Sequence, residues 1–433
     1  SEWENSPLNN KTAAAKNTFE MIAPLNKGIG LIEQPLSHEA IPGFGWNLLR
    51  EDLSLPAAVL YEETLRQNLE WMRQFSTAYG VRLAPHGKTT MAPQLFAMQL
   101  EAGAWGITLA TAHQVNVAYS HGARRVLMAN QLVGRQNMSA IAQLLRDPEF
   151  EFYCLVDSAD QVAQLGSYFV QANGRLNVLI ELGVDGGRTG VRNAGQLQSL
   201  LEALSQTRDS LRLCGVEVYE GVLEDELSIR AFLRHAVNVT NEIAAKRLFQ
   251  RDPILLSGAG SAWYDVVAEI FTAGSFQSPV EVVLRPGCYL THDIGAYRKA
   301  QTRIEQNNPI AHRMQSGLKP ALKIWAYVQS VPEPEKAIVS MGKRDAAFDS
   351  GLPVPAFHFR PGDAIPNPVP AHWTVTRMMD QHSYLKVAPH DRILPGDMIA
   401  FDIAHPCLTF DKWRILALVN SRHDVIDLIQ TYF

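Results

Sequence analysis

Cysteine is scarce in this chain, and the spacing of the few cysteines excludes two classes of protein. The 433 residues include four, at Cys154, Cys214, Cys288 and Cys407, and no CxxC pair occurs among them. Such wide spacing argues against a disulfide framework and against a redox dithiol. At least one of these cysteines therefore needs another explanation.

Long apolar runs and basic clusters are also missing. No window of about 18 uncharged apolar residues occurs, and the first 30 residues lack the apolar stretch of a secretory signal. The net charge is −5, and no basic run indicates a nucleic-acid or membrane surface. We therefore expect a cytoplasmic protein that acts on small molecules, with no nucleic-acid or membrane partner.

What the chain does contain, from residue 82 onward, is a series of short apolar runs with helical patterns between them. Each run is apolar on successive residues, which is typical of parallel strands covered on both faces. The runs lie at 82–87, 106–110, 125–129, 152–156, 177–181, 213–218, 254–258 and 281–285. Eight strands alternating with helices over about 200 residues predict a (β/α)8 TIM barrel of the α/β class. A doubly wound open sheet remains the alternative.

The segments on either side of these runs have different patterns. Residues 57–61 form a further apolar run, and the amphipathic segment that follows leads into the barrel. Beyond the barrel, β-rich pieces are separated by Pro and Gly turns. We predict an N-terminal extension at 1–54 that packs on a C-terminal β domain at 311–433, with the barrel at 55–310.

Unusual residues follow the predicted strands at their C-terminal ends, where TIM barrels carry their chemistry. Lys88 follows the first strand, DGGR at 185–188 the fifth, and YEG at 219–221 the sixth. SGAGS at 257–261 closes the seventh strand, and RPGCY at 285–289 closes the eighth. We therefore expect all five segments to face one end of the barrel.

Lys88 lies in PHGKT, at the end of an apolar run. A lysine amine is normally protonated at neutral pH, but burial favours its neutral form, which can attack a carbonyl to form a Schiff base. A lysine that only caps the end of a sheet is the alternative. The other loops decide between the two.

The SGAGS loop predicts a phosphate site. Small residues leave backbone N–H groups and hydroxyls free to bind an anion, and the loops after the seventh and eighth strands are the usual phosphate site of a barrel. We expect Gly258, Gly260 and Ser261 to contact the phosphate, with Ser257 as a further candidate. A Schiff-base lysine and a phosphate loop at one barrel mouth together indicate pyridoxal phosphate as cofactor.

A possible metal pair lies near the C-terminus, where His405 and Cys407 are two residues apart in an expected strand. Side chains at this spacing in a strand point to the same face, and imidazole with thiolate suits Zn²⁺. Two ligands are too few for a closed structural site. The pair therefore fits either an open catalytic site or an incidental pairing.

The joint pattern resembles the alanine racemase-like, fold-type III pyridoxal phosphate enzymes, within them the D-serine dehydratase and D-threonine aldolase branch. The matching motifs are PHGKT at 85–89, GRTGV at 187–191, VYEG with Tyr219, SGAGS at 257–261, RPGCY at 285–289 and HPC at 405–407. They span most of residues 55–433. Two features depart from the family: Gly87 and Thr90 replace larger or basic residues, and the N-terminal extension is longer than the fold requires.

The resemblance implies roles for several residues. Lys88 would carry the cofactor, with Tyr219 beside its ring or phosphate and Arg188 near the ring. For Arg188, an ion pair with Asp185 or Glu181 is equally open. His382 is either part of the site or a surface histidine.

The resemblance also implies a reaction, the β-elimination of a D-3-hydroxy amino acid such as D-serine to a keto acid and ammonia. Lys88 would remove the α-proton, and Zn²⁺ or another divalent metal on His405 and Cys407 would assist the departure of hydroxide. The related aldolases typically have Asp in place of Cys407, which favours the dehydratase.

Three other functions remain open. They are a D-threonine aldolase-type lyase, an amino-acid racemase and a non-catalytic pyridoxal phosphate carrier. The resemblance further implies a homodimer in which His405 and Cys407 complete the partner's site.

Overall fold

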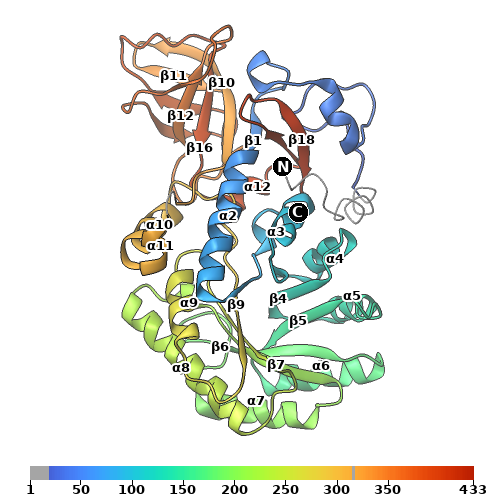
Figure 1. Ribbon diagram of the computed structural model, residues 1–433. Coiled ribbons are helices and arrows are strands. Elements are labelled where there is room, and N and C mark those ends of the chain that lie inside the picture. Colours follow the sequence, from blue (N-terminus) through green and yellow to red (C-terminus); the bar gives the residue numbers. More distant parts are fainter. Residues whose placement is uncertain (1–18, 315–316) are drawn as a thin grey trace, which may run out of the picture.

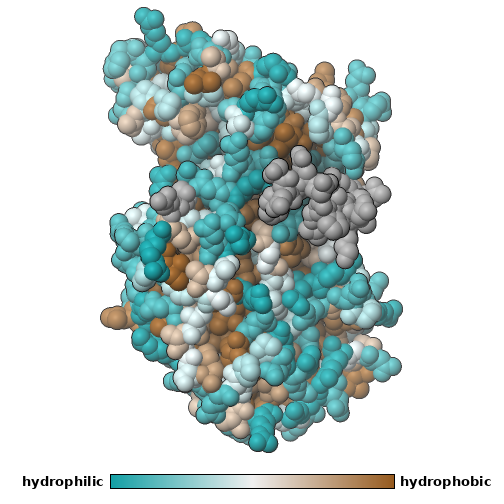
Figure 2. All heavy atoms as spheres, viewed as in Figure 1, coloured by the Kyte–Doolittle hydropathy of each residue, from teal (hydrophilic) through white to brown (hydrophobic). Residues whose placement is uncertain are grey.

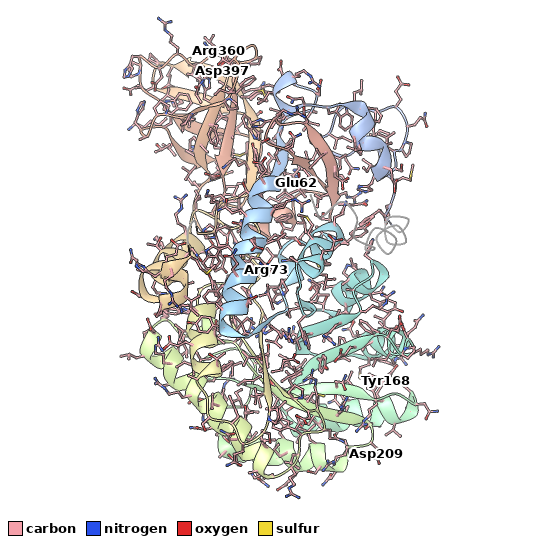
Figure 3. All side chains as sticks on the ribbon, in the orientation of Figure 1. Glu62, Arg73, Tyr168, Asp209, Arg360 and Asp397 are labelled. Atoms are coloured by element: carbon pink, nitrogen blue, oxygen red, sulfur yellow. The ribbon has the colours of Figure 1, made fainter. Side chains whose placement is uncertain are left out.

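The computed structural model describes residues 19–314 and 317–433, which form a barrel and a β domain joined by one long helix. The helix, α2 (Glu62–Tyr79), runs between the two parts (Figure 1). Glu62 lies at the end of α2 beside the β domain, and Arg73 lies nearer the barrel (Figure 3). One face of α2 buries Leu65, Leu69 and Met72 against the core, as its pattern of apolar residues requires.

The barrel consists of eight parallel strands in the described residues. They are β2 (Arg82–Leu83), β3 (Ile107–Leu109), β4 (Arg125–Gln131), β5 (Glu151–Val156), β6 (Leu176–Leu182), β7 (Leu211–Val218), β8 (Ile254–Gly258) and β9 (Val280–Leu284). The order runs β2-β9-β8-β7-β6-β5-β4-β3, and the barrel closes where His86 bridges Thr108. There the Thr108 N–H donates to the Pro85 carbonyl at 2.9 Å. The predicted (β/α)8 fold is confirmed.

Helices cover the outside of the barrel. They are α3 (Pro93–Glu101), α4 (Ala112–Ser120), α5 (Arg135–Leu144), α6 (Ala159–Gln171), α7 (Ala194–Gln206), α8 (Glu226–Ala245), α9 (Tyr264–Thr272), α10 (Ala296–Asn307) and α11 (Pro309–Arg313). Along β5, Tyr153 and Leu155 fill the barrel interior, whereas Phe152 and Cys154 pack on the helices. Because both faces of each strand are buried, its residues are apolar without alternation.

The β domain is built on a ten-stranded sheet. Its strands are β1 (Ala57–Tyr61), β10 (Leu322–Glu333), β11 (Lys336–Val339), β12 (Val354–Phe359), β13 (Asn367–Pro368), β14 (Thr374–Met378), β15 (Ser383–Lys386), β16 (Met398–Asp402), β17 (Ile415–Val419) and β18 (Val425–Gln430). Arg360 and Asp397 lie together at the end of this domain remote from the barrel (Figure 3), with two N–H groups of Arg360 donating to the carboxylate. The predicted C-terminal β domain is confirmed as a fold.

The strand at 57–61 corrects one expectation. The sequence placed it with the barrel, but β1 pairs antiparallel with β10 and parallel with β17 inside the β-domain sheet. Its apolar pattern fits either location, because a strand buried on both faces has the same pattern in both. Only the strands with which β1 pairs show which of the two domains it belongs to.

The N-terminal segment shares a core with the β domain. Ile29, Ile41 and Trp46 pack in one apolar cluster with Trp325 and Met398. Two short 3-10 helices, η1 (His38–Phe44) and η2 (Leu48–Arg50), shape this segment. Residues 1–18 of the predicted extension lie outside the described residues, and the boundary at 311 stays a prediction.

The surface seen in Figure 2 is a mixture of hydrophilic and hydrophobic residues, without one continuous apolar belt over the helices in view. Within residues 19–314 and 317–433, no helix combines the length and hydropathy that crossing a membrane requires.

Asn68 provides a test of how α2 is attached to the loops beside it. Its buried amide donates to the Leu290 and Lys319 carbonyls, each at 2.8 Å, and accepts from the Lys319 N–H at 2.9 Å. Asn68→Ala leaves these groups without partners, and we expect it to lower the free energy of unfolding by about 2–3 kcal/mol. Thermal unfolding measures the effect. The exposed Glu63→Ala on the same helix is the control, and equal midpoints for both variants would contradict the role of Asn68.

Candidate active site at the barrel mouth

One cavity collects the C-terminal ends of the barrel strands and a segment of the β domain. It is lined by His86, Lys88, Thr89, Arg188, Tyr219, Ala259, Gly260, Ser261, Arg285, Gly287, Cys288, Tyr297, His405 and Cys407. Seven of the nine residues predicted for the site are among them. The other two, Ser257 and Gly258, lie deeper in the barrel wall. His382 lies on an exposed turn between β14 and β15 and does not line this cavity.

Lys88 lies on η3 (Gly87–Thr89), a single 3-10 turn after β2. The turn packs so closely on the barrel that a Cβ at Gly87 would lie 2.7 Å from a Phe96 ring carbon. The Lys88 side chain is exposed to the cavity, and the cavity walls partly desolvate its amine. This partial desolvation lowers the pKa of Lys88. The nearby Cys407 opposes the shift, and the positive charges of Arg188 and Arg285 add to it. The fraction of neutral, nucleophilic amine is therefore larger than for an ordinary lysine.

His86 also lines the cavity, although its motif did not single it out. Its Nδ1 atom is buried and has no hydrogen-bond partner in the described residues. Burial holds the pKa of His86 well below its ordinary range, and the charges of Lys88 and Arg285 add to the shift. The ring is therefore neutral at pH 7, and its unpartnered nitrogen is available to a ligand.

Arg188 and Tyr219 form a stacked pair in the cavity. The Arg188 guanidinium carbon lies 4.2 Å from the centre of the Tyr219 ring. Among the described residues, no ion pair joins Arg188 to Asp185 or Glu181. The Glu181 carboxylate instead accepts from Thr189 at 2.8 Å. The guanidinium thus remains a charge without a carboxylate partner in the cavity wall.

The loop after β8 is held by two sets of hydrogen bonds. The buried carboxylate of Glu220, in η4 (Glu220–Val222), accepts from the Ala259 and Gly260 N–H groups at 3.1 and 2.8 Å. Ser261 Oγ accepts from the Gly287 and Cys288 N–H groups at 3.2 and 3.1 Å. Two main-chain donors therefore converge on one oxygen position at the cavity surface, and a phosphate oxygen could use the same donors.

Ser257 has a different role from its prediction. Its hydroxyl donates to the Val283 carbonyl and accepts from the Arg285 Nε atom, both at 3.0 Å. Gly258 is surrounded by core side chains such as Val267 and Phe271. Both residues build the wall of the barrel, which leaves Gly260 and Ser261 at the cavity.

Arg285 and Glu217 form a buried ion pair that the sequence did not reveal. Arg285 is 3% exposed and Glu217 is 1% exposed, and the guanidinium also donates to the Val218 carbonyl at 3.0 Å. Burial raises the pKa of Glu217, and the opposing charge of Arg285 works against that rise. The conspicuous RPGCY loop was noted in the sequence, but its partner lies 68 residues away on β7.

His405 and Cys407 meet the cavity from the β domain, although not from a strand. β16 ends at Asp402, and Cys407 begins the single-turn helix α12 (Cys407–Phe410). Cys407 Sγ lies 3.5 Å from Thr89 Oγ1 and 3.9 Å from Cys288 Sγ. The expectation of an extended HxC pair was wrong, because Pro406 turns the chain. The pair lines the same cavity as Lys88 of its own chain, and its expected role in a partner's site stays a prediction.

His405 and Cys407 shift each other's pKa in opposite directions. Hydrogen bonds from Cys288, His405 and Thr89 hold the pKa of Cys407 well below its usual range. His405 Nδ1 lies 2.7 Å from Asp349 Oδ2, and its interactions with Cys407 and then Asp349 raise the pKa of His405 to about 9. A thiolate beside an imidazole anchored by a carboxylate is a typical donor pair for a transition metal. Among the described residues, no three His, Cys, Asp or Glu side chains converge on one metal position.

Comparisons with known proteins agree with this geometry. The family described as "Alanine racemase, N-terminal domain" matches residues 61–289, which include Lys88 and the loops after β6 to β9. The chain belongs to the alanine racemase-like, fold-type III pyridoxal phosphate enzymes. The "Putative serine dehydratase domain" matches residues 321–419 and places it in the D-serine dehydratase and D-threonine aldolase branch.

Individual relatives support the same placement. The D-threonine aldolase of Arthrobacter sp. is 25% identical over 346 residues, which cover 77% of this chain and 80% of that protein. The D-threo-3-hydroxyaspartate dehydratase of Delftia sp. (strain HT23) is 30% identical over 171 residues, 39% of this chain and 44% of that protein. The crystal structure of D-threonine aldolase from Filomicrobium marinum has a TM-score of 0.71 at 24% identity, covering 89% and 97% of the two chains, and shows a shared fold. The protein is thus a pyridoxal phosphate-dependent lyase of the D-amino-acid dehydratase and aldolase family.

The ion pair of Arg285 and Glu217 gives a test of the barrel mouth. Arg285→Met leaves the Glu217 carboxylate buried without its partner, and we expect a loss of about 3–5 kcal/mol in the free energy of unfolding. Adding Glu217→Gln removes the uncompensated charge and should recover a large part of that loss. Thermal unfolding of the single and double variants measures both effects. A double variant less stable than Arg285→Met would contradict this account.

Proposed function

We propose that this protein is a pyridoxal phosphate- and zinc-dependent D-serine dehydratase, which converts a D-3-hydroxy amino acid to a keto acid and ammonia. The observation that carries the proposal is that Lys88 and the two candidate metal ligands, His405 and Cys407, line one cavity. Lys88 reaches the cavity from the barrel, and its neighbour Thr89 contacts Cys407 from the β domain. A base and a metal ligand at one substrate position fit an elimination that needs both.

The cavity fits the cofactor at several points. The Gly287 and Cys288 N–H groups that meet at Ser261 Oγ would bind its phosphate, and the amine of Lys88 would hold its aldehyde carbon. The unpartnered Nδ1 of His86 and the stacked Arg188 and Tyr219 side chains would lie along its ring. When bound, pyridoxal phosphate supplies the electron sink for the charge left by the departing α-proton.

Lys88 is the residue that we propose to move the proton. Its lowered pKa makes the neutral amine more accessible than in an ordinary lysine, and the neutral amine can accept a proton from the substrate α-carbon. Arg188 and Arg285 keep the charge around it positive, which favours a substrate carboxylate in the same cavity.

His405 and Cys407 are the residues that we propose to hold Zn²⁺. A divalent metal there would supply Lewis acidity, which makes hydroxide a better leaving group. Asp349 orients the His405 ring through Nδ1 and leaves Nε2 for the metal. Solved structures of a D-threo-3-hydroxyaspartate dehydratase include a His-to-Ala variant and a metal-free Cys-to-Ala variant. The two substituted positions are two residues apart in that protein, as His405 and Cys407 are here.

A D-threonine aldolase is the second candidate. The similarity to the Arthrobacter aldolase covers more of this chain than the similarity to the Delftia dehydratase does. Cys407 favours the dehydratase, because it gives the metal a soft thiolate ligand that suits zinc. A racemase would not need the metal ligands His405 and Cys407. A non-catalytic cofactor carrier would not need the β domain. We retain a homodimer as part of the proposal, to be checked by its mass in solution.

The role of Lys88 can be tested by spectroscopy. The wild type should show the visible absorption band of a pyridoxal imine, and Lys88→Ala should lose both the band and at least about 1000-fold of the activity. Lys336→Ala removes a lysine in the β domain, outside the cavity, and is the matched control. An unchanged band in Lys88→Ala would show that another group carries the cofactor.

The reaction itself can be tested by product analysis. We expect D-serine to yield pyruvate and ammonia, with activity lost on chelation and in His405→Ala, and restored to the chelated wild type by Zn²⁺. His390→Ala alters an exposed histidine outside the cavity and should keep full activity. Glycine and an aldehyde from D-threonine would instead identify an aldolase. Racemisation that survives chelation would identify a racemase.

A further inference from the structure

Cys288 is a second thiol at the mouth of the barrel, and nothing in the proposed reaction uses it. It follows Gly287 in the loop after β9, and its side chain is 4% exposed. Its Sγ atom lies 3.9 Å from the Sγ atom of Cys407. The other cysteines, Cys154 and Cys214, are buried in the barrel walls away from the cavity.

The backbone holds Cys288 firmly in this place. Its N–H donates to Ser261 Oγ at 3.1 Å, and its carbonyl accepts from the His292 N–H at 2.7 Å. The neighbouring Gly287 packs against the turn that carries Lys88, where a Cβ would lie 2.7 Å from the His86 carbonyl oxygen and from Thr89 Oγ1. The approach of the two sulfur atoms is therefore set by the packing of two barrel loops.

The separation of the sulfur atoms points to a shared metal. It is much longer than a disulfide bond of about 2.05 Å. Two sulfur ligands on one tetrahedral zinc, each bound at about 2.3 Å, lie about 3.8 Å apart. The observed 3.9 Å between Cys288 Sγ and Cys407 Sγ is close to that spacing.

We propose that Cys288 is a third protein ligand of the metal, together with Cys407 and His405. This inference rests on the metal site of the proposed function and adds a ligand to it. In the described residues the three side chains do not yet converge on one metal position, so metal binding would have to draw them together. The Cys2His set leaves the fourth tetrahedral position open to substrate, as a catalytic zinc requires.

The proposal also assigns the metal. Two thiolates and an imidazole favour zinc strongly over magnesium or manganese, which prefer oxygen ligands. A site with only His405 and Cys407 would have water in two positions and would discriminate less between these metals.

Cobalt spectroscopy on the purified protein, stripped of metal and kept reduced, tests the assignment. Each thiolate bound to Co²⁺ contributes a sulfur-to-metal absorption band, so Cys288→Ser should show about half the wild-type intensity. Its zinc affinity, measured by competition with a chromophoric chelator, should fall at least about 100-fold, more than loss of an outer-shell partner causes. Cys214→Ser removes a buried thiol of the barrel wall and should match the wild type in both measurements.

A second measurement needs no variant, so it holds even if Cys288→Ser does not fold. X-ray absorption at the zinc edge of the wild-type holoenzyme should count two sulfur neighbours at about 2.3 Å. One sulfur neighbour, or full cobalt bands in Cys288→Ser, would overturn the role of Cys288 and leave the metal of the proposed function in place. A wild type that binds neither zinc nor cobalt would overturn both.

Discussion

The contact between the β domain and the mouth of the barrel is the interaction on which the site depends. Residues 403–410 descend from β16 and meet the loop after β9, where the Ile294 N–H donates to the Ile403 carbonyl at 3.3 Å. Cys407 then lies in contact with Thr89 and Cys288, which belong to two different barrel loops. Without this contact the barrel would present Lys88 and the loop after β8 but neither His405 nor Cys407.

The charges at the barrel mouth explain which ligands it can hold. Lys88, Arg188 and Arg285 line one cavity, and the buried Glu217 balances only part of their charge. An excess of positive charge in a partly buried cavity favours anions. A cofactor phosphate and a substrate carboxylate would both meet that preference. The same charges help to lower the pKa of Lys88, so the features that attract the ligands also prepare the amine.

The side of the cavity that carries the proposed metal ligands has sulfur groups in place of positive charges. Cys407 and Cys288 provide sulfur, and Asp349 holds His405 from outside the cavity. Cationic groups and sulfur ligands thus line one cavity. In the proposed reaction, a proton would be removed on one side and a hydroxide would leave on the other. Such a division suits an elimination, in which the two events occur on neighbouring carbon atoms of one substrate.

The sequence by itself determined the barrel and the position of its reactive loops. Buried parallel strands need apolar residues on both faces, so each strand appears as a short apolar run, and the polar residues after it mark the mouth. Lys88, Gly260 and Ser261 could be placed at the cavity for that reason. The resemblance to the family motifs added His405 and Cys407 to the predicted site.

Only the tertiary structure decided which distant residues meet. The strand at 57–61 joins the β domain, because its apolar pattern fits either sheet and only pairing with β10 and β17 settles the choice. Glu217 on β7 forms an ion pair with Arg285, which follows β9. The hydroxyl of Ser257 accepts a hydrogen bond from Arg285 and does not line the cavity. Cys288 reaches Cys407 across 119 residues of chain. The local sequence pattern indicates which residues are buried and where strands end. Which separate segments come into contact depends on how the whole core packs, because that packing sets the distances between them.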